Sequence, residues 1–249
     1  MSTLELTGPT APYDDLAAFY DLLSPPSEYS TWIAHIERVA IAYGLRGGRV
    51  LDVACGSGHS TNPWLERGYS VVGCDRSPRM LSLAAERTGG RAALELADLR
   101  ELPALGSFDL VTCLNDSLNH LLSPRDVRAA LRGMASNMAS GGLIVFDVNT
   151  LDTLRRAFSC SWTREYDDRL VMWRGVGPAE LPPGGTTHAQ LVLFGADSHG
   201  GWTRHSHELR ERHYPLETIA PRWSLAESCA RDWASIAART CPAYTRPAS

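Results

Sequence analysis

Three residues in the first third of the chain have the types and the spacing of a nucleoside-binding site. Gly56 and Gly58 follow a run of apolar residues, and without a Cβ they let the backbone turn sharply and approach a ligand. Asp75 ends the next apolar run about 20 residues later, where an acid reaches the ribose hydroxyls in dinucleotide-binding units. The arrangement predicts a strand, a glycine turn, a helix and a second strand that together bind a nucleoside cofactor.

Two neighbouring residues bear on which nucleoside is bound. An NAD fingerprint normally carries a third glycine, and here that position is Thr61. Asp52 stands at the end of the first apolar run, where a carboxylate can orient backbone and water around an ammonium group. A nicotinamide cofactor has no such group, so an NAD-dependent oxidoreductase is the weaker alternative.

Four segments come in the order found in one enzyme family, and together they cover roughly residues 45 to 150. They resemble the motifs of class I S-adenosylmethionine-dependent methyltransferases, and the matching runs are Leu51–Gly58, Gly73–Leu81, Ala97–Leu99 and Phe108–Cys113. Tyr13-Asp14, Phe19-Tyr20-Asp21 and the segment after the fifth strand resemble a small-molecule branch that includes glycine and amino-sugar N-methyltransferases.

This resemblance implies S-adenosylmethionine as cofactor, S-adenosylhomocysteine as product and a role for each matching position. The methionine end would meet Asp52, Ala54, Gly56 and Gly58, with Tyr20 over its carboxylate. Asp75 would bind the ribose hydroxyls, while Arg76 and Met80 would flank the adenine, Asp98 would accept from its amine and the Leu99 amide would meet a ring nitrogen. Leu114 and Asn115 would border the sulfonium.

The segment from Asn115 to His120 lies where acceptor-facing residues are expected. Methyl transfer from a sulfonium chiefly requires alignment and exclusion of water, and a base is needed only if the acceptor arrives protonated. His120 is the first candidate for a base or orienting group and Asp116 the second, with a histidine that merely caps local backbone as the alternative.

Several functions remain open at this point. A small-molecule amine is the preferred acceptor, with O- or C-methylation and a non-catalytic cofactor-binding scaffold as alternatives. Nucleic-acid amine methyltransferases usually show Asn/Asp-Pro-Pro-Tyr after the fourth strand, whereas this chain reads Asn115-Asp116-Ser117-Leu118. No metal is expected, because no carboxylate or cysteine shows ligand spacing with His205, His207 and His213.

The elements that must position these residues alternate between short apolar strands and helices. Strands are predicted at Val50–Val53, Val71–Cys74, Ala92–Leu96, Leu110–Leu114 and Leu143–Val148. The predicted fold is α/β, a Rossmann-like doubly wound, mainly parallel sheet with an N-terminal helical cap and an antiparallel β-meander inserted after the fifth strand. Ser77-Pro78 and Ser123-Pro124 predict helix starts, and Gly141-Gly142 is expected to stop the second of these helices.

A single domain over 1–249 is expected, with a helical cap at 1–44, a cofactor-binding core at 45–150, an insertion at 151–215 and an irregular part at 216–249. Three insertion strands are predicted at Trp162–Arg174, His188–Phe194 and Trp202–Tyr214. Period two places Arg204, Arg210 and Arg212 on one face of the last strand, either in solvent or against an anionic acceptor. Ser224–Arg239 looks helical rather than like a closing strand pair.

Composition narrows the function further. The chain has 249 residues and a net charge of −4, which offers no basic grip on nucleic acid. All 24 basic residues are arginine, so Schiff-base catalysis and a P-loop lysine are excluded. No membrane span, signal peptide or paired cysteine motif is visible, so a cytoplasmic protein with reduced thiols is expected. The expected partner is a small-molecule acceptor, and a homodimer is left open.

Overall fold

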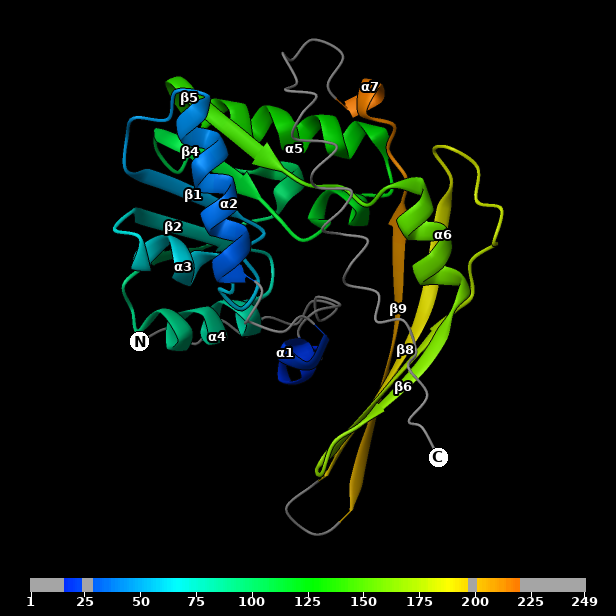
Figure 1. The fold of residues 1–249 in the computed structure, drawn as a ribbon. Helices are drawn as coiled ribbons and strands as arrows, with labels where there is room; N and C mark the ends of the chain where they lie inside the picture. The colour runs from blue at the N-terminus through cyan, green and yellow to red at the C-terminus, as the bar shows by residue number, and fades with distance from the viewer. Residues whose placement is uncertain (1–15, 24–28, 197–200, 220–249) are drawn as a thin grey trace. The chain divides into compact units, whose positions relative to one another are not determined.

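The computed structural model describes residues 16–23, 29–196 and 201–219. The chain divides into two compact units (Figure 1). The first comprises the chain up to Leu114 together with Ala130–Val145, and the second comprises Asn115–Ala129 and the chain from Phe146 onward.

The first unit is built on a five-stranded sheet. Its strands are β1 (Arg49–Val53), β2 (Ser70–Asp75), β3 (Ala93–Leu96), β4 (Phe108–Cys113) and β5 (Met138–Phe146), in the order β3-β2-β1-β4-β5. The strand order reverses between β1 and β4, and open α/β sheets bind their ligands at the carboxyl ends of the strands at such a point. The predicted Rossmann-like fold class, with its additional antiparallel sheet, is confirmed.

The centre of this sheet forms the core of the first unit. Val50 and Leu51 of β1 and Leu110 and Val111 of β4 are completely buried. Strands covered on both faces read as continuous apolar runs, which is why the sequence located these two strands to within two residues at each end.

The helices of the first unit either precede β1 or alternate with the strands. They are η1 (Ala17–Phe19), α1 (Tyr20–Leu23), α2 (Tyr29–Ala42), α3 (Thr61–Glu66), α4 (Pro78–Thr88) and η3 (Leu99–Glu101). The Ser77 hydroxyl caps α4 by accepting from the Met80 amide at 3.1 Å, and Gly89 closes the helix in the left-handed region at φ 59°.

The end of α5 (Pro124–Ser136) differs from the prediction, and the two units divide this helix between them. The helix stops at Ser136 because the Asn137 side-chain amide donates to the carbonyls of Gly133 and Pro103, at 2.9 and 2.8 Å. Gly141-Gly142 therefore lies inside β5 and does not end the helix.

The second unit carries an antiparallel sheet in the order β6-β7-β8-β9. Its elements are η4 (Ser117–His120), α6 (Leu151–Ser159), β6 (Ser161–Glu165), β7 (Arg169–Gly175), β8 (Thr186–Ala196), β9 (Trp202–Arg212) and α7 (Leu216–Ile219). A small core of Leu154, Phe158, Leu181 and Ala189 joins α6 to this sheet.

One predicted strand of the insertion is in fact a hairpin. Residues 162–174 form β6 and β7, since Tyr166 and Arg169 exchange backbone hydrogen bonds of 2.8 and 3.4 Å around Asp167-Asp168. Two aspartates between β-branched and aromatic runs are a turn signal, and the sequence prediction of one strand was wrong because it did not weigh them.

Some predictions concern residues outside the described ranges. These include Tyr13-Asp14 and the helical interpretation of Ser224–Arg239. Within the ranges that the structure describes, no helix is both long enough and apolar enough to cross a bilayer.

Candidate functional site

The turn after β1 has the backbone of a ligand-binding loop. Ala54, Gly56 and Gly58 have φ values of 56°, 52° and 81°. At Gly58 a Cβ would lie 3.1 Å from the Ala84 backbone, so glycine allows α4 to pack against the turn. Ala54 has no such freedom, and a left-handed alanine costs roughly 1–2 kcal/mol. Strain of this kind persists where the surroundings impose it, as they do at binding loops.

Asp52 supplies part of that restraint. Its carboxylate is 1% exposed, and Oδ2 accepts from the hydroxyls of Ser60 and Thr61 at 2.7 Å each, while Oδ1 accepts from Thr112 at 2.9 Å. Burial raises the pKa of Asp52, and the three hydroxyl donors oppose that rise. Asp52 thus fastens the end of β1 to the start of α3 and to β4.

Asp75 lies against the same turn. Its Oδ2 accepts from the Gly56 amide at 3.0 Å and its Oδ1 accepts from the Ser77 amide at 2.9 Å. Burial raises the pKa of Asp75, against the lowering effect of these two donors. The structure therefore brings Asp75 and Gly56 together. A carboxylate oxygen has two lone pairs, so each oxygen can accept a further hydrogen bond from a ligand.

The predicted adenine-side residues follow β2 and β3. Asp98 caps η3 by accepting from the Arg100 amide at 2.9 Å, and its ion pair with the Arg100 guanidinium lowers its pKa. Met80 and Leu99 are buried. Among the smaller effects, the positive charge of Arg76 lowers the pKa of both Asp75 and Asp98.

Sequence reasoning missed a polar link beside Tyr20. Asp21 accepts from Arg87 at 2.9 Å through both oxygens and pairs with His59 Nε2 at 2.8 Å. Tyr20 stacks on the His59 ring at 5.9 Å, and its hydroxyl would lie 3.8 Å from a Cβ on Gly56. The link fixes α1 beside the glycine turn, and only the charge types of its members hinted at it in the sequence.

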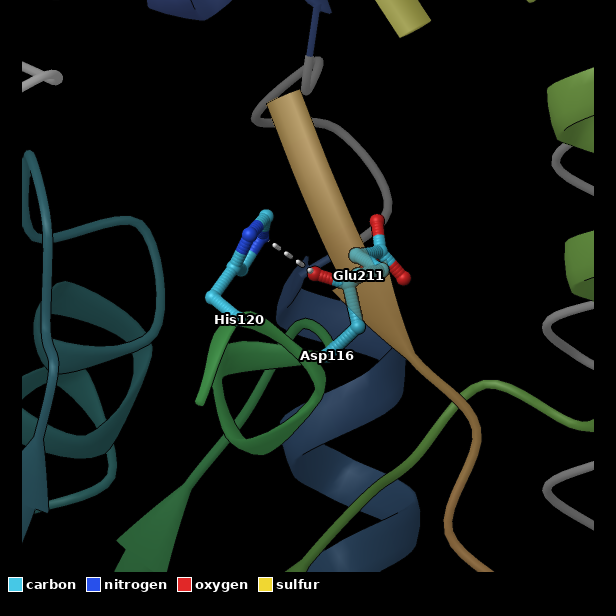
Figure 2. A group of neighbouring side chains, drawn as sticks. All are labelled: Asp116, His120 and Glu211. Atoms are coloured by element: carbon cyan, nitrogen blue, oxygen red, sulfur yellow. Dashed lines mark ion pairs between the residues drawn. The ribbon is translucent and has the colours of Figure 1, made fainter. Parts of the chain in front are cut away.

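A second group of titratable side chains lies wholly in the second unit. Figure 2 shows Asp116 immediately before η4, His120 at the end of η4 and Glu211 on β9. His120 Nε2 is 3.6 Å from Asp116 Oδ1, and one ligand atom from each of the three residues lies within 4.8 Å of the others. The His120 and Asp116 side chains are 25% and 28% exposed, whereas Glu211 is 5% exposed. The group therefore opens toward His120 and Asp116 and is closed behind Glu211.

Two asparagines hold this group in place. The Asn149 side-chain amide donates to Asp116 Oδ2 at 2.9 Å and to Glu211 Oε2 at 2.8 Å. Asn119 is fully buried and ties η4 to β9, because its amide donates to the Arg212 carbonyl at 2.8 Å. Its side-chain oxygen also accepts from the Asn149 backbone amide at 2.8 Å.

Neighbouring charges and burial shift the pKa values of His120, Asp147 and Glu211. Burial opposes the charged form of His120, but Asp116 and Glu211 outweigh it and raise the pKa of His120 to about 9. Burial and the Asp116 charge raise the pKa of Glu211 and raise that of Asp147 to about 7. His120 is therefore a cation at neutral pH, and the buried carboxylates hold their protons more tightly than usual.

His120 Nδ1 is 3.2 Å from the Arg210 carbonyl. A ring N–H donated there directs Nε2 toward Asp116 in either protonation state. The same three side chains, Asp116, His120 and Glu211, also have ligand types that a divalent ion could use.

Leu114 and Asn115 stand at the junction of the two units, Leu114 at the end of one and Asn115 at the start of the other. Asn115 and Asp116 have φ values of 60° and 52°, and asparagine and aspartate tolerate this left-handed conformation better than most residues. The chain thereby makes a sharp turn three residues after β4 ends.

Aromatic side chains of the β6–β7 hairpin pack on one another and on an arginine. Trp162 stacks on Trp173 at 6.1 Å, and Arg164 lies 4.9 Å from the Trp162 ring. On β9, Arg204 and Arg210 are exposed, as in the solvated alternative for the arginine face, whereas Arg212 is half-buried and donates to the Leu122 carbonyl at 3.0 Å. A separate pocket of about 320 Å³ is lined in part by Arg128, Arg212 and His213.

Comparisons with known proteins agree with this geometry. A family model described as a methyltransferase domain matches residues 50–142. The YqeM protein of Bacillus subtilis, a methyltransferase by name, is 31% identical over 174 residues, which span 68% of this chain and 69% of YqeM. Glycine N-methyltransferase of Oryctolagus cuniculus is 36% identical over 150 residues, 53% of this chain and 49% of that enzyme.

A solved structure shares the fold. It is an S-adenosylmethionine-dependent methyltransferase from Clostridium acetobutylicum, which aligns with a TM-score of 0.71 at 24% identity and covers 85% of each chain.

Proposed function

This chain belongs to the S-adenosylmethionine-dependent methyltransferases, and from that premise we propose that it methylates the nitrogen of a small-molecule amine. The observation that supports an amine acceptor is the acidic group of Asp116 and Glu211, which begins three residues after β4 ends. Glycine N-methyltransferase, a relative by sequence, acts on an amine by name.

We assign the cofactor-binding role to the predicted residues of the first unit. Ala54, Gly56 and Gly58 offer a backbone surface without long side chains, and Asp75 beside them has acceptor capacity for ribose hydroxyls. Asp52 acts on the cofactor through the turn that it holds, since its carboxylate accepts hydrogen bonds from Ser60, Thr61 and Thr112. The remaining predicted cofactor residues keep the roles given above as proposals.

When bound, S-adenosylmethionine supplies a methyl group on a sulfonium, which is already an activated leaving group. Transfer would form a bond between the acceptor nitrogen and that methyl carbon and would break the carbon–sulfur bond, whose electron pair would stay on sulfur. The tasks of the protein are to hold the nitrogen in line and to deliver it unprotonated.

At the acceptor end, His120 and Asp116 act as a pair. Because the pKa of His120 is raised to about 9, the imidazole is protonated at neutral pH and serves as an orienting cation rather than as the base. Asp116 accepts from the acceptor while Asn149 holds its other oxygen at 2.9 Å.

The proposal is tested by turnover on matched acceptors. Purified protein is incubated with S-adenosylmethionine and primary amines, amino sugars, carboxylates or phenols, and S-adenosylhomocysteine formation is measured. We expect turnover with amines alone. Turnover confined to phenols or carboxylates would favour O-methylation, and cofactor binding without turnover on any compound would favour a scaffold.

We further propose a cytoplasmic location. The support is that Cys55, Cys74, Cys113 and Cys160 form no disulfide bond within the described residues. Light scattering of the purified protein decides whether it is a homodimer.

A further inference from the structure

The group around Glu211 contains more hydrogen-bond acceptors than donors. Asp116, Asp147 and Glu211 supply three carboxylates. In addition to burial, the charge of Asp116 raises the pKa of both Asp147 and Glu211, and the charge of Asp147 raises that of Glu211. His120 is the cationic member of the group. The Asn149 side-chain amide already donates to one oxygen of Asp116 and to one oxygen of Glu211. Even with His120 protonated, ionising all three acids leaves an excess of negative charge.

Two buried oxygens at the edge of the group show the same deficit of donors. Asp147 Oδ1 has no hydrogen-bond partner among the described residues, although Oδ2 accepts from the Asp116 amide at 2.8 Å. Thr187 is 1% exposed, its Oγ1 lacks a partner within the same ranges, and it stands directly opposite Glu211 in the β8–β9 pairing. Side chains so paired point to the same face of a sheet.

A ligand that completes this group must bring positive charge and several N–H donors. A protonated primary amine brings both in one atom. Acceptors that each lie about 2.9 Å from an ammonium nitrogen are about 4.7 Å apart in a tetrahedral arrangement. The ligand atoms of Asp116, His120 and Glu211 lie within 4.8 Å of one another, so the carboxylates can share one nitrogen.

We propose that Glu211 and Asp116 bind the ammonium group of the acceptor and that Glu211 is the base that removes its proton. The inference rests on the proposed function and adds a catalytic residue and a substrate class, amines that are cationic when they bind. The proton passes from nitrogen to a Glu211 oxygen, which leaves a neutral amine and a carboxylic acid. The lone pair then attacks the methyl carbon, and the methylated product leaves as an ammonium ion. Glu211 returns its proton to solvent.

The position of Glu211 suits this role. Burial keeps water from the carboxylate, and the Asn149 contact at 2.8 Å fixes one oxygen while the group opens on the His120 side. The raised pKa of Glu211 brings it toward that of an alkylammonium ion, which reduces the cost of the transfer.

The charged neighbours of Glu211 set the expected pH dependence. They are Asp116 just before η4, His120 on η4, Asp147 after β5, and Arg210 and Arg212 beside it on β9. The base must be ionised, so kcat/KM rises with pH as Glu211 loses its proton. It falls again where the free acceptor itself becomes neutral.

The test compares Glu211→Gln, Glu211→Asp and the control Glu208→Gln on an alkyl amine and on an aromatic amine that is uncharged at neutral pH. Glu208 is a suitable control because it lies on the same strand, is exposed and pairs with Arg210. At pH 7.5 we expect Glu211→Gln to lower kcat/KM for the alkyl amine by about 100-fold. The loss should shrink at pH 10, remain small for the aromatic amine, and be partly restored in Glu211→Asp.

The outcomes separate this inference from its premise. Equal losses on both amines, or no loss on either, would overturn the role of Glu211 while amine methylation stands. Methyl transfer to oxygen or carbon instead would remove the proposed function as well. The group could also hold a divalent ion, so each assay is repeated after EDTA treatment and with added Mn²⁺. Wild-type activity that is lost with EDTA and restored by Mn²⁺ would replace the ammonium site by a metal site. Unchanged S-adenosylhomocysteine affinity in each variant shows that its fold is intact.

Discussion

The side-chain amide of Asn149 donates to Glu211 Oε2 at 2.8 Å, so a residue that follows β5 fixes a carboxylate on β9. The same amide reaches Asp116, and one side chain therefore sets the separation of the two acids. Without it, each carboxylate would lose a neutral donor and could rotate away from a shared ligand.

The first prediction concerns that asparagine. Asn149→Ala should raise KM for an amine acceptor by about tenfold, because two hydrogen bonds that preorganise the carboxylates are lost. Steady-state kinetics measures KM, and a calorimetric titration with S-adenosylhomocysteine serves as the control, which we expect to be unchanged. A wild-type KM in this variant would show that acceptor binding does not depend on the hydrogen bonds from Asn149 to the two carboxylates.

A second prediction concerns stability and pH through His120. The folded-state pKa of about 9 exceeds the ordinary value of 6.5, so His120 contributes stability that is fully present below about pH 6.5. That contribution is lost as the pH rises through 9.

His120→Gln should therefore lower the free energy of unfolding most at pH 6, by up to about 3 kcal/mol, and much less at pH 9.5. Urea denaturation of both proteins at the two pH values gives the difference. A difference that does not change with pH would contradict the raised pKa.

The third prediction concerns the cofactor. Asp75→Ala should weaken binding of S-adenosylhomocysteine by about tenfold or more, because hydrogen bonds to a charged group are worth about 1.5–3 kcal/mol. It also frees the amides of Gly56 and Ser77, so Asp75→Asn is the matched variant that keeps one acceptor oxygen. Calorimetry showing unchanged affinity in a folded Asp75→Ala protein would remove Asp75 from the cofactor site.

A fourth prediction separates structure from binding at Asp52. Asp52→Ala leaves three buried hydroxyls without their acceptor, and we expect the free energy of unfolding to fall by about 3 kcal/mol or more. Thr112→Val removes one donor of nearly the same shape and should cost about 1 kcal/mol. Urea denaturation tests both, and similar small losses in the two variants would mean that Asp52 does not fasten the turn.

The sequence was sufficient for the parts of the fold in which local signals and burial agree. β1 and β4 are covered on both faces, and α4 has a serine cap, a first-turn proline and a closing glycine, so each was visible as a pattern. Asp75 and Gly56 could be paired because their spacing follows from one strand–turn–helix–strand unit.

Where prediction failed, longer-range contacts decided the outcome. Asn137 ends α5 through carbonyls of two different segments, and no local pattern reports those contacts. The Asp167-Asp168 turn was visible in the sequence but lay within a run that otherwise favours a strand.

Glu211 was missed for a related reason. It stands 95 residues from Asp116 in a strand rich in arginine and histidine, so only the pairing of β9 with β8 and its contact with Asn149 reveal its neighbours. Its signal in the sequence was weak, an acid on the same face of the strand as His205, His207 and His213.

The central claim is that this methyltransferase transfers its methyl group to an amine nitrogen. The most direct test uses S-adenosylmethionine with a trideuterated methyl group, an amine acceptor that also bears a hydroxyl, and tandem mass spectrometry of the product. We predict that the label resides on nitrogen. Label on oxygen or carbon, or S-adenosylhomocysteine formed without any labelled acceptor, would contradict the claim.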